Sequence, residues 1–379
     1  LYTLFYERGL ELTKKDKGFL CFITSNKWMR AGYGKSLRKY FISKNPKILI
    51  DLGGNIFESA TVDTNILLIE NSSNKNNTLA ISIKNNKREI VDQVKNEAIR
   101  ISFKDSDSWF IGSEEELSLK EKIEKNGKPL KDWDVKINRG ILTGLNEAFI
   151  INKETRDELI AEDPKSEEII KPILRGRDIG KYIYNFADLY ILATGYDTDI
   201  SNFYPAIYNY LLKFEKAAKK RQDQGKNWWN LRACIYYEEF EKEKVVWGNI
   251  SYNSQFCFVK GGIFVNAPAN IITSSSVNIK YLVGVMNSKI FNYEFKSRGI
   301  FLGDAYEWKK QYVEGVNLPL LNSEKNKIKA EEIIMLVDKI IKIKLRDPNS
   351  LTKELEDKID LLVCDLYDLN EEERAIILK

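Results

Sequence analysis

The chain has 379 residues, with 59 Lys and Arg against 55 Asp and Glu for a net charge of +4, and it contains no histidine. The absence of histidine excludes Ser-His-Asp and Cys-His catalysis and histidine metal sites from this chain. No apolar run approaches the length of a membrane span and no secretory pattern leads the sequence, so we expect a cytoplasmic protein without a membrane partner. The cysteines are too scattered for a disulfide framework or a metal site. They are Cys21, Cys234, Cys257 and Cys364.

The first part of the chain predicts an α/β arrangement. Continuous apolar runs bounded by Gly or polar residues are typical of strands covered on both faces. Strands with little helical cover leave apolar faces unburied, and the sequence has no initiating Met, so we expect partner strands that precede Leu1. The expected elements are helices over Leu1–Leu12 and around Met29–Ser43, and strands over Gly18–Ser25, Lys47–Leu52, Thr61–Glu70 and Leu79–Lys84.

The remainder alternates short strands with turns and then becomes helical. Ser113–Lys125 predicts a helix that ends at Asn126-Gly127. From Glu324 onward apolar residues recur at helical spacing, which predicts a closing helical segment. The other expected helices lie near Lys153–Ala161, Pro205–Lys220 and Tyr281–Phe295.

A basic run with interleaved aromatic residues begins inside the second of these helices and continues beyond it. Seven cations are accompanied only by Glu215 and Asp223, and Trp228 and Trp229 lie among them. Such a run can hold phosphates and contact bases or sugars. The alternative is a solvated helix whose far end packs both tryptophans into a core. The cations are Lys213, Lys216, Lys219, Lys220, Arg221, Lys226 and Arg232.

A Gly-punctuated turn supplies a second set of candidate DNA-binding residues. Gly140 and Gly144 permit a positive φ or a close backbone approach. The turn can offer an Arg and backbone N–H groups to phosphate, or polar side chains to base edges. Its polar residues are Arg139, Thr143, Asn146 and Glu147.

A third set surrounds Gly176, where Arg175 and Arg177 precede Asp178. Arg can bind guanine bidentately. The alternative is that Asp178 pairs with one Arg and holds the turn together. Arg298, near the loop at 299–304, is expected to add a phosphate contact.

The first segment resembles the late part of an N6-adenine DNA methyltransferase domain. The matching stretches are GFLCFITSNKWMRAGYGKSLRKYF and DLGGNIFESATVDTNILLIE. The middle segment is similar to the target recognition domain of TaqI-like methyltransferases and of Eco57I-like fused restriction-modification enzymes. Its matching blocks are Ile137–Asn152, Ile169–Tyr182, Lys244–Ser251, Lys280–Phe295 and Asn317–Leu321.

The resemblance implies that the intact enzyme flips an adenine and transfers a methyl group from S-adenosylmethionine to N6 of that base. The family's Gly-rich cofactor turn and its Asn-Pro-Pro-Tyr motif are not in this chain, and Gly53-Gly54 fits a simple turn better than a nucleotide loop. Phe57 matches the aromatic residue that packs on the flipped adenine, since an aromatic face restores the stacking that the base leaves behind. The alternative is that Phe57 fills a core. We therefore expect the chain alone to bind double-stranded DNA and to catalyse nothing.

The expected fold class is α/β, a partial Rossmann-like methyltransferase sheet, followed by an α+β target recognition domain and a C-terminal helical module. The expected boundaries are 1–110, 111–322 and 323–379. Two other functions stay open: a DNA-specificity subunit, against which the methyltransferase-like strands argue, and a modification methylase without nuclease, including phage-defence methylases. Mg²⁺ is expected only if a nuclease lies upstream. We expect a monomer.

Overall fold

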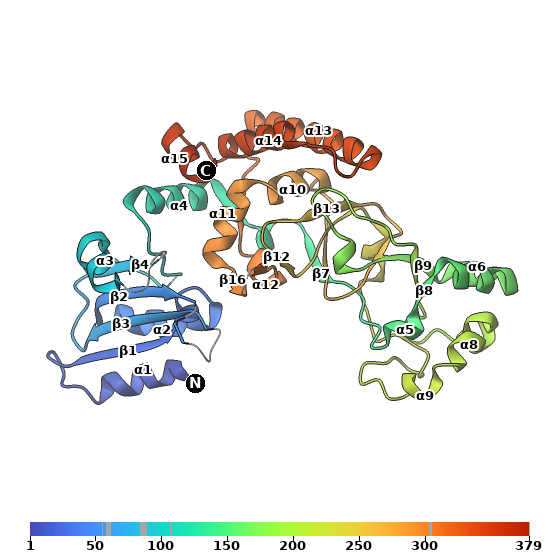
Figure 1. Cartoon of the computed structure of the whole chain (residues 1–379), viewed down its shortest axis with the longest axis horizontal. Helices are drawn as coiled ribbons and strands as arrows, with labels where there is room; N and C mark the ends of the chain where they lie inside the picture. The colour runs from blue at the N-terminus through green and yellow to red at the C-terminus, as the bar shows by residue number, and fades with distance from the viewer. Residues whose placement is uncertain (55, 58–61, 84–88, 107, 303–304, 379) are drawn as a thin grey trace. The chain divides into compact units, whose positions relative to one another are not determined.

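The computed structural model describes the chain apart from residues 55, 58–61, 84–88, 107, 303–304 and 379 (Figure 1). The described residues form a mixed α/β protein of several sheets in two compact units. Unit 1 holds Leu1–Lys122, Lys296–Gly303 and Glu371–Ile376, and unit 2 holds Ile123–Phe295, Asp304–Asn370 and Ile377–Lys379. Within the described ranges no helix combines the length and apolar character that a membrane crossing requires.

Unit 1 is built on a five-stranded sheet with the strand order β1-β3-β2-β4-β5. β3 runs antiparallel to both β1 and β2, while β2 and β4 are parallel. The strands predicted from the apolar runs are confirmed. The elements are α1 (Tyr2–Glu11), β1 (Phe19–Ser25), α2 (Lys35–Ile42), β2 (Asn45–Gly53), β3 (Thr64–Glu70), β4 (Thr78–Ser82), α3 (Ile90–Glu97) and β5 (Ile99–Ile101).

The helix expected around Met29–Ser43 is shorter than predicted. Two 3₁₀ turns, Asn26–Met29 and Gly32–Gly34, precede α2. Gly34 passes so close to the Trp28 carbonyl that a Cβ would lie 2.1 Å from its oxygen. The chain therefore folds back tightly before the regular helix begins.

The core of unit 1 is aromatic. Trp28 meets Phe41 edge-on with ring centroids 5.0 Å apart, and Trp109 stacks on Phe103 at 4.2 Å. On the other hand, Phe19 and Ile23 of β1 are exposed. Apolar side chains on this edge strand are thus uncovered, in agreement with the expectation from the sequence, while the preceding partner strands stay a prediction.

Unit 2 contains two four-stranded sheets, ordered β14-β9-β10-β8 and β13-β11-β15-β7. Its main core lies between strands of both sheets and the helix α8 (Pro205–Leu212), with Ile173, Ile207 and Ile271 fully buried. The strands after β5 are β6 (Gly127–Pro129), β7 (Lys136–Arg139), β8 (Ile150–Asn152), β9 (Ile170–Leu174), β10 (Leu189–Leu192), β11 (Lys244–Trp247), β12 (Ile250–Ser251), β13 (Phe256–Val259), β14 (Phe264–Val265), β15 (Asn270–Thr273), β16 (Ile300–Leu302), β17 (Ala305–Glu307) and β18 (Asn317–Pro319), of which β16 belongs to unit 1.

Two helices predicted as continuous are interrupted. The expected Pro205–Lys220 helix is split into α8 and α9, and the expected Tyr281–Phe295 helix is split into α10 and α11. At the second break Asn287 donates to and accepts from the backbone of Phe256 on β13, so the helix stops where its side chain joins the sheet. The helices are α4 (Glu114–Asn126), α5 (Asn146–Phe149), α6 (Lys153–Glu162), α7 (Ile200–Phe203), α8 (Pro205–Leu212), α9 (Glu215–Ala218), α10 (Ile279–Met286), α11 (Lys289–Arg298), α12 (Lys310–Val313), α13 (Glu324–Arg346), α14 (Lys353–Leu366) and α15 (Glu371–Leu378).

The long helix α13 packs with α14 against α10 (Figure 1). Gly284 of α10 is the point of closest approach, because a Cβ there would lie 2.5 Å from Ile333 Cγ2. Asp360 of α14 is buried beside α11, where its Oδ1 accepts a hydrogen bond from the Lys289 backbone N–H at 2.8 Å. Burial raises the pKa of Asp360 from 3.8 to about 6.

This raised pKa predicts a pH-dependent stability. The folded chain binds the Asp360 proton more tightly than the unfolded chain, so the contribution is complete below about pH 4 and is lost as the pH rises through about 6. Asp360→Asn keeps an acceptor for Lys289 and cannot ionise. We expect it to raise the free energy of unfolding by roughly 2–3 kcal/mol at about pH 7.5 and to change it little at about pH 4. Urea unfolding at both pH values tests this; an equal effect at both would contradict it.

Candidate nucleic-acid interface

Two strands of unit 2, β7 and β9, end at one cluster of loops. This loop cluster comprises the turns that follow β7 and β9 and the segment between β14 and β15. Arg139 ends β7 opposite Asn270 of β15, and the next residue, Gly140, donates its N–H to the Ala269 carbonyl at 2.7 Å. A Cβ at Gly140 would lie 2.5 Å from the Val265 carbonyl oxygen. A close backbone approach therefore requires Gly140, which confirms one of the two expectations for this turn, and Arg139 is left exposed at the end of its strand.

The turn after β9 joins the same loops. The Asn266 N–H donates to the carbonyl of Leu174 at 2.8 Å, directly before Arg175. Arg175 and Asp178 form a bidentate pair, with Nε–Oδ2 and Nη2–Oδ1 distances of 3.0 and 2.7 Å, which raises the pKa of Arg175. Asp178 also accepts the Arg175 N–H. The structural alternative for this pair is thus confirmed.

Arg177, unlike the paired Arg175, faces solvent. It is exposed at the tip of the Gly176–Asp178 turn, and among the described residues it has no ion-pair partner. The backbone of Gly176 lies against Gly248, which follows β11. The next residue, Asn249, accepts a hydrogen bond from the Asn270 amide at 2.7 Å. No local pattern in the sequence pointed to these two amides, because their contact joins distant strands.

Arg221 is buried, which corrects its assignment as a DNA-binding residue. Its side chain lies over the Phe149 ring, and the residue is only 7% exposed. The guanidinium donates four hydrogen bonds to backbone carbonyls, and burial lowers its pKa to about 10. The acceptors are Ala218 at 3.2 Å, Thr143 at 2.7 Å, Trp228 at 2.6 Å and Asn230 at 2.9 Å.

Arg221 and its four acceptors form a hub that connects two segments far apart in the sequence. Through Arg221 the Thr143 turn is attached to the chain that follows α9. Thr143 is itself buried, and its hydroxyl lies 2.5 Å from Oδ1 of exposed Asn146. Thr143 therefore positions Asn146 and presents no free surface of its own.

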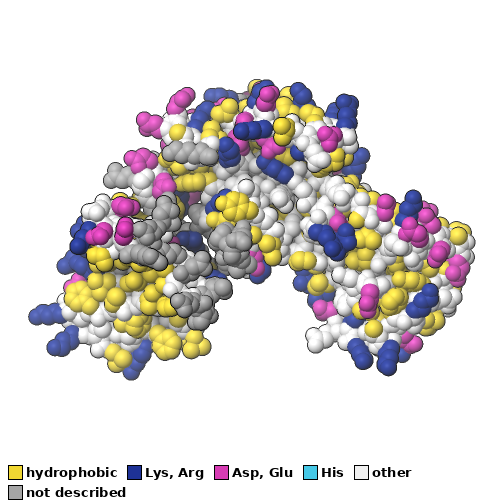
Figure 2. Space-filling model, in the orientation of Figure 1, with side chains coloured by type: hydrophobic (Ala, Val, Ile, Leu, Met, Phe, Trp, Pro, Cys, Tyr) yellow, Lys and Arg dark blue, Asp and Glu magenta, His cyan; other side chains and the backbone are white. Residues whose placement is uncertain are grey.

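The basic run divides into exposed cations and packed aromatic residues. Lys219 pairs with Glu215 at 2.6 Å on the surface, while Lys220 is exposed and has no ion pair within the described ranges. Trp228 and Trp229 lie edge-on to each other with ring centroids 5.4 Å apart, and both pack against the main core. The core alternative for the tryptophans is thus confirmed. Figure 2 shows Lys and Arg side chains gathered over the region of α9.

Two predicted site residues belong neither to the turns after β7 and β9 nor to the basic run. Phe57, between β2 and β3, is 46% exposed, so it does not fill a core. The helix α11 ends at Arg298, whose side chain lies outside the described residues.

Among the described residues of unit 1, the turn at Gly53 and the nearby Asp51 do not fit S-adenosylmethionine. Gly53 is the last residue of β2 and has a φ of 63°, which fits a simple turn. The nearby acid Asp51 is buried and bonded to Arg30 at 2.8 Å and to Asn26 at 2.7 Å, so it is not free to bind a ribose. In the part of the chain that the structure describes, no three Asp, Glu, Cys or His side chains are grouped to hold a metal ion.

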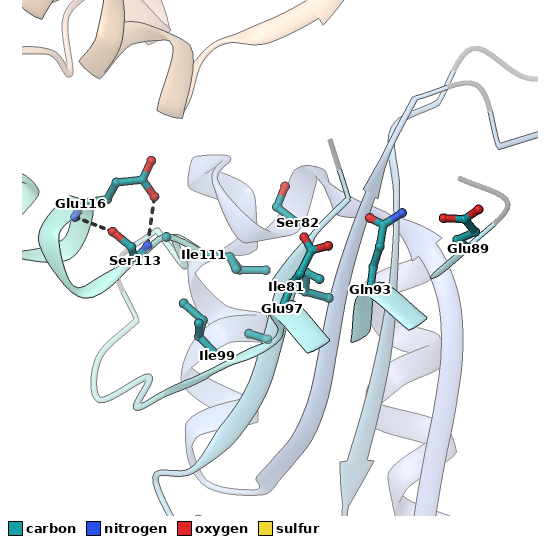
Figure 3. Close-up of a pocket in the computed structure, with 11 residues that line it drawn as sticks. Ile81, Ser82, Glu89, Gln93, Glu97, Ile99, Ile111, Ser113 and Glu116 are labelled. Carbon is teal, nitrogen blue, oxygen red and sulfur yellow. Dashed lines mark hydrogen bonds between the residues drawn. The ribbon is translucent and has the colours of Figure 1, made fainter. Parts of the chain in front are cut away.

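A cavity of about 470 Å³ lies in unit 1 beside β4, α3 and the start of α4 (Figure 3). Its described lining carries three carboxylates, from Glu89, Glu97 and Glu116, and no cation. Glu116 accepts the Ser113 N–H and helps to begin α4. The carboxylates among the described lining residues do not favour phosphate.

The hub predicts that Arg221 stabilises unit 2. Arg221→Met keeps much of the side-chain length and removes all four hydrogen bonds, so we expect a loss of about 1.5–3 kcal/mol in the free energy of unfolding. Amide exchange should accelerate at 143–146 and 227–231. The exposed neighbour provides the control, since Lys220→Met should stay within about 0.5 kcal/mol. Equal effects of the two variants in urea unfolding would refute the role of the hub.

Comparison with known families gives two matches. Residues 1–57 match the Eco57I restriction-modification methylase family, and residues 171–320 match the TaqI-like C-terminal specificity domain. The second match contains the turn with Arg177, the basic run and the strands β11 to β15. The resemblance inferred from the sequence is therefore confirmed.

Relatives and a solved structure agree with these matches. The chain is 23% identical to the type II methyltransferase M.BstVI of Geobacillus stearothermophilus, covering 100% of this chain and 68% of that protein. It is 24% identical to the type II methyltransferase M.MjaIV of Methanocaldococcus jannaschii, over 64% of this chain and 82% of the relative.

The fold is similar to that of the type IIL restriction-modification enzyme MmeI, solved in complex with DNA, with a TM-score of 0.63 at 12% identity. That match covers 100% of this chain, which spans 51% of the MmeI chain. The chain is thus similar to DNA methyltransferases of restriction-modification systems and includes a segment similar to their target recognition domain.

Proposed function

We propose that this chain is the DNA-recognition part of a site-specific adenine-N6 DNA methyltransferase, and that unit 2 binds double-stranded DNA. The observation that carries the proposal is the loop cluster of unit 2. There Arg139 and Arg177 are exposed at neighbouring strand ends, and the Arg221 hub connects the Thr143 turn to the basic run. The match of residues 171–320 to a specificity domain supports it.

Burial divides the candidate residues into two roles. Lys219 and Lys220 carry exposed charge next to the hub, which suits contacts with phosphates. Arg139, Asn146 and Arg177 end in planar donor groups that suit base edges in the major groove. Arg175, Arg221 and Thr143 are held by the protein itself and set the shape of the loops.

Methyl transfer requires groups outside this chain. The proposed intact enzyme binds S-adenosylmethionine through residues that these 379 positions do not supply. Within this chain, half-exposed Phe57 is free to stack on a flipped adenine, which would hold the base away from its partner strand. We infer a cytoplasmic monomer that needs Mg²⁺ only where a nuclease accompanies the methylase. A methylase without nuclease is the alternative.

The proposal predicts salt-dependent DNA binding through the basic run. Reversal of two charges, Lys219→Glu with Lys220→Glu, should weaken binding to random and specific duplexes alike. The slope of log affinity against log salt should decrease by about 0.9 for each phosphate that the variant no longer neutralises. Fluorescence anisotropy at several salt concentrations measures both quantities.

A matched control lies on α13, at the opposite end of unit 2 (Figure 1). Lys325→Glu with Lys327→Glu makes the same charge change at exposed positions. We expect it to keep most of the affinity and the slope. If the parent chain fails to bind any duplex at low salt, the proposed function is wrong.

Arg177 predicts a different kind of effect. Arg177→Ala should cost about 1–3 kcal/mol at the selected site and relax preference at one base pair, with little change on random DNA. Arg175→Ala should instead loosen the turn and reduce stability. Selection from a randomised duplex followed by sequencing separates the two variants; an unchanged motif for Arg177→Ala would remove Arg177 from the base contacts.

A further inference from the structure

An isoleucine beside the loop cluster faces solvent completely. Ile235 is 99% exposed, in a turn between the basic run and β11. Its neighbours Cys234 and Tyr236 are partly buried and pack against the main core. Because the residues on both sides are held inward, the backbone presents Ile235 outward.

The same turn is held beside Arg139. The Arg139 guanidinium lies close enough to the Tyr236 hydroxyl and the Cys234 thiol to oppose the rise in pKa that burial causes at both groups. Tyr236 packs in turn near Phe240, with ring centroids 6.1 Å apart. Ile235 and Arg139 are therefore neighbours on the surface, and contacts to the core fix the segment that carries the isoleucine.

The combination of an exposed aliphatic side chain and a guanidinium indicates which part of a DNA duplex Ile235 would contact. A phosphate favours cations and gains nothing from an aliphatic side chain. The minor groove presents no methyl group to distinguish bases, whereas thymine presents its C5-methyl in the major groove. The guanine edge there offers two acceptors that match the fork of an arginine. A guanidinium beside an aliphatic side chain thus complements a purine edge next to a pyrimidine methyl.

We propose that Ile235 is a specificity-determining residue that contacts a thymine methyl group in the major groove, next to a base contacted by Arg139. This inference rests on the proposed function, since it requires DNA on the loop cluster. The contact would add a preference for thymine at one position of the recognition site.

The test uses the chain as it is. A duplex motif is first selected with the parent chain, and each thymine in it is then replaced singly by deoxyuridine, which removes only the methyl group. We expect one replacement to weaken binding roughly three- to tenfold, the effect of taking one methyl group out of an apolar contact. Ile235→Ala should bind both duplexes equally, and Ile235→Val should keep the discrimination.

A second exposed aliphatic residue supplies the matched control. Leu351, before α14, is 94% exposed, and Leu351→Ala should behave as the parent chain does. If no deoxyuridine replacement weakens binding, or if Ile235→Ala still discriminates, the inference is overturned while the proposed function stands. If the parent chain shows no salt-dependent binding to any duplex, both are overturned.

Discussion

The buried guanidinium of Arg221 is the interaction on which the candidate interface depends. Moving a charged group out of water is costly, and four carbonyls together with the Phe149 ring offset that cost here. The carbonyls belong to the Thr143 turn, to the end of α9 and to the tryptophan segment. One side chain thus fixes the relative positions of backbone segments that have little regular structure of their own.

The arginines of unit 2 show that residue type alone does not assign a role. Arg175 has its donors committed to Asp178, and Arg221 has most of its donors committed to carbonyls. Arg177, two residues from Arg175, is exposed at the tip of the same turn. The committed arginines make the loops stiff, and stiff loops lose less conformational entropy when they bind. On the proposed function, Arg175 would fix the shape of the turn and Arg177 would contact the bases.

Much of the fold could be predicted from the sequence, and the site only in part. Continuous apolar runs identified the strands of unit 1, because such runs report local burial. The helix break at Asn287 was missed, since it depends on a contact with Phe256 across the fold. The burial of Arg221 was missed for the same reason: its acceptor Thr143 lies 78 positions away. Ile235 carried no local signal, because exposure is set by how its neighbours pack.

The two units have separate hydrophobic cores, and this bears on how recognition and chemistry are divided. The main core of unit 2 is formed by residues between Ile141 and Ile271, while the aromatic core of unit 1 lies within its first 109 residues. The loops of the candidate interface are bonded to the unit 2 core through Gly140, Asn266 and Arg221. Their geometry is thus set by contacts within unit 2. On the proposed function, the loops of unit 2 would set base preference, while Phe57, which belongs to unit 1, would stack on the flipped base.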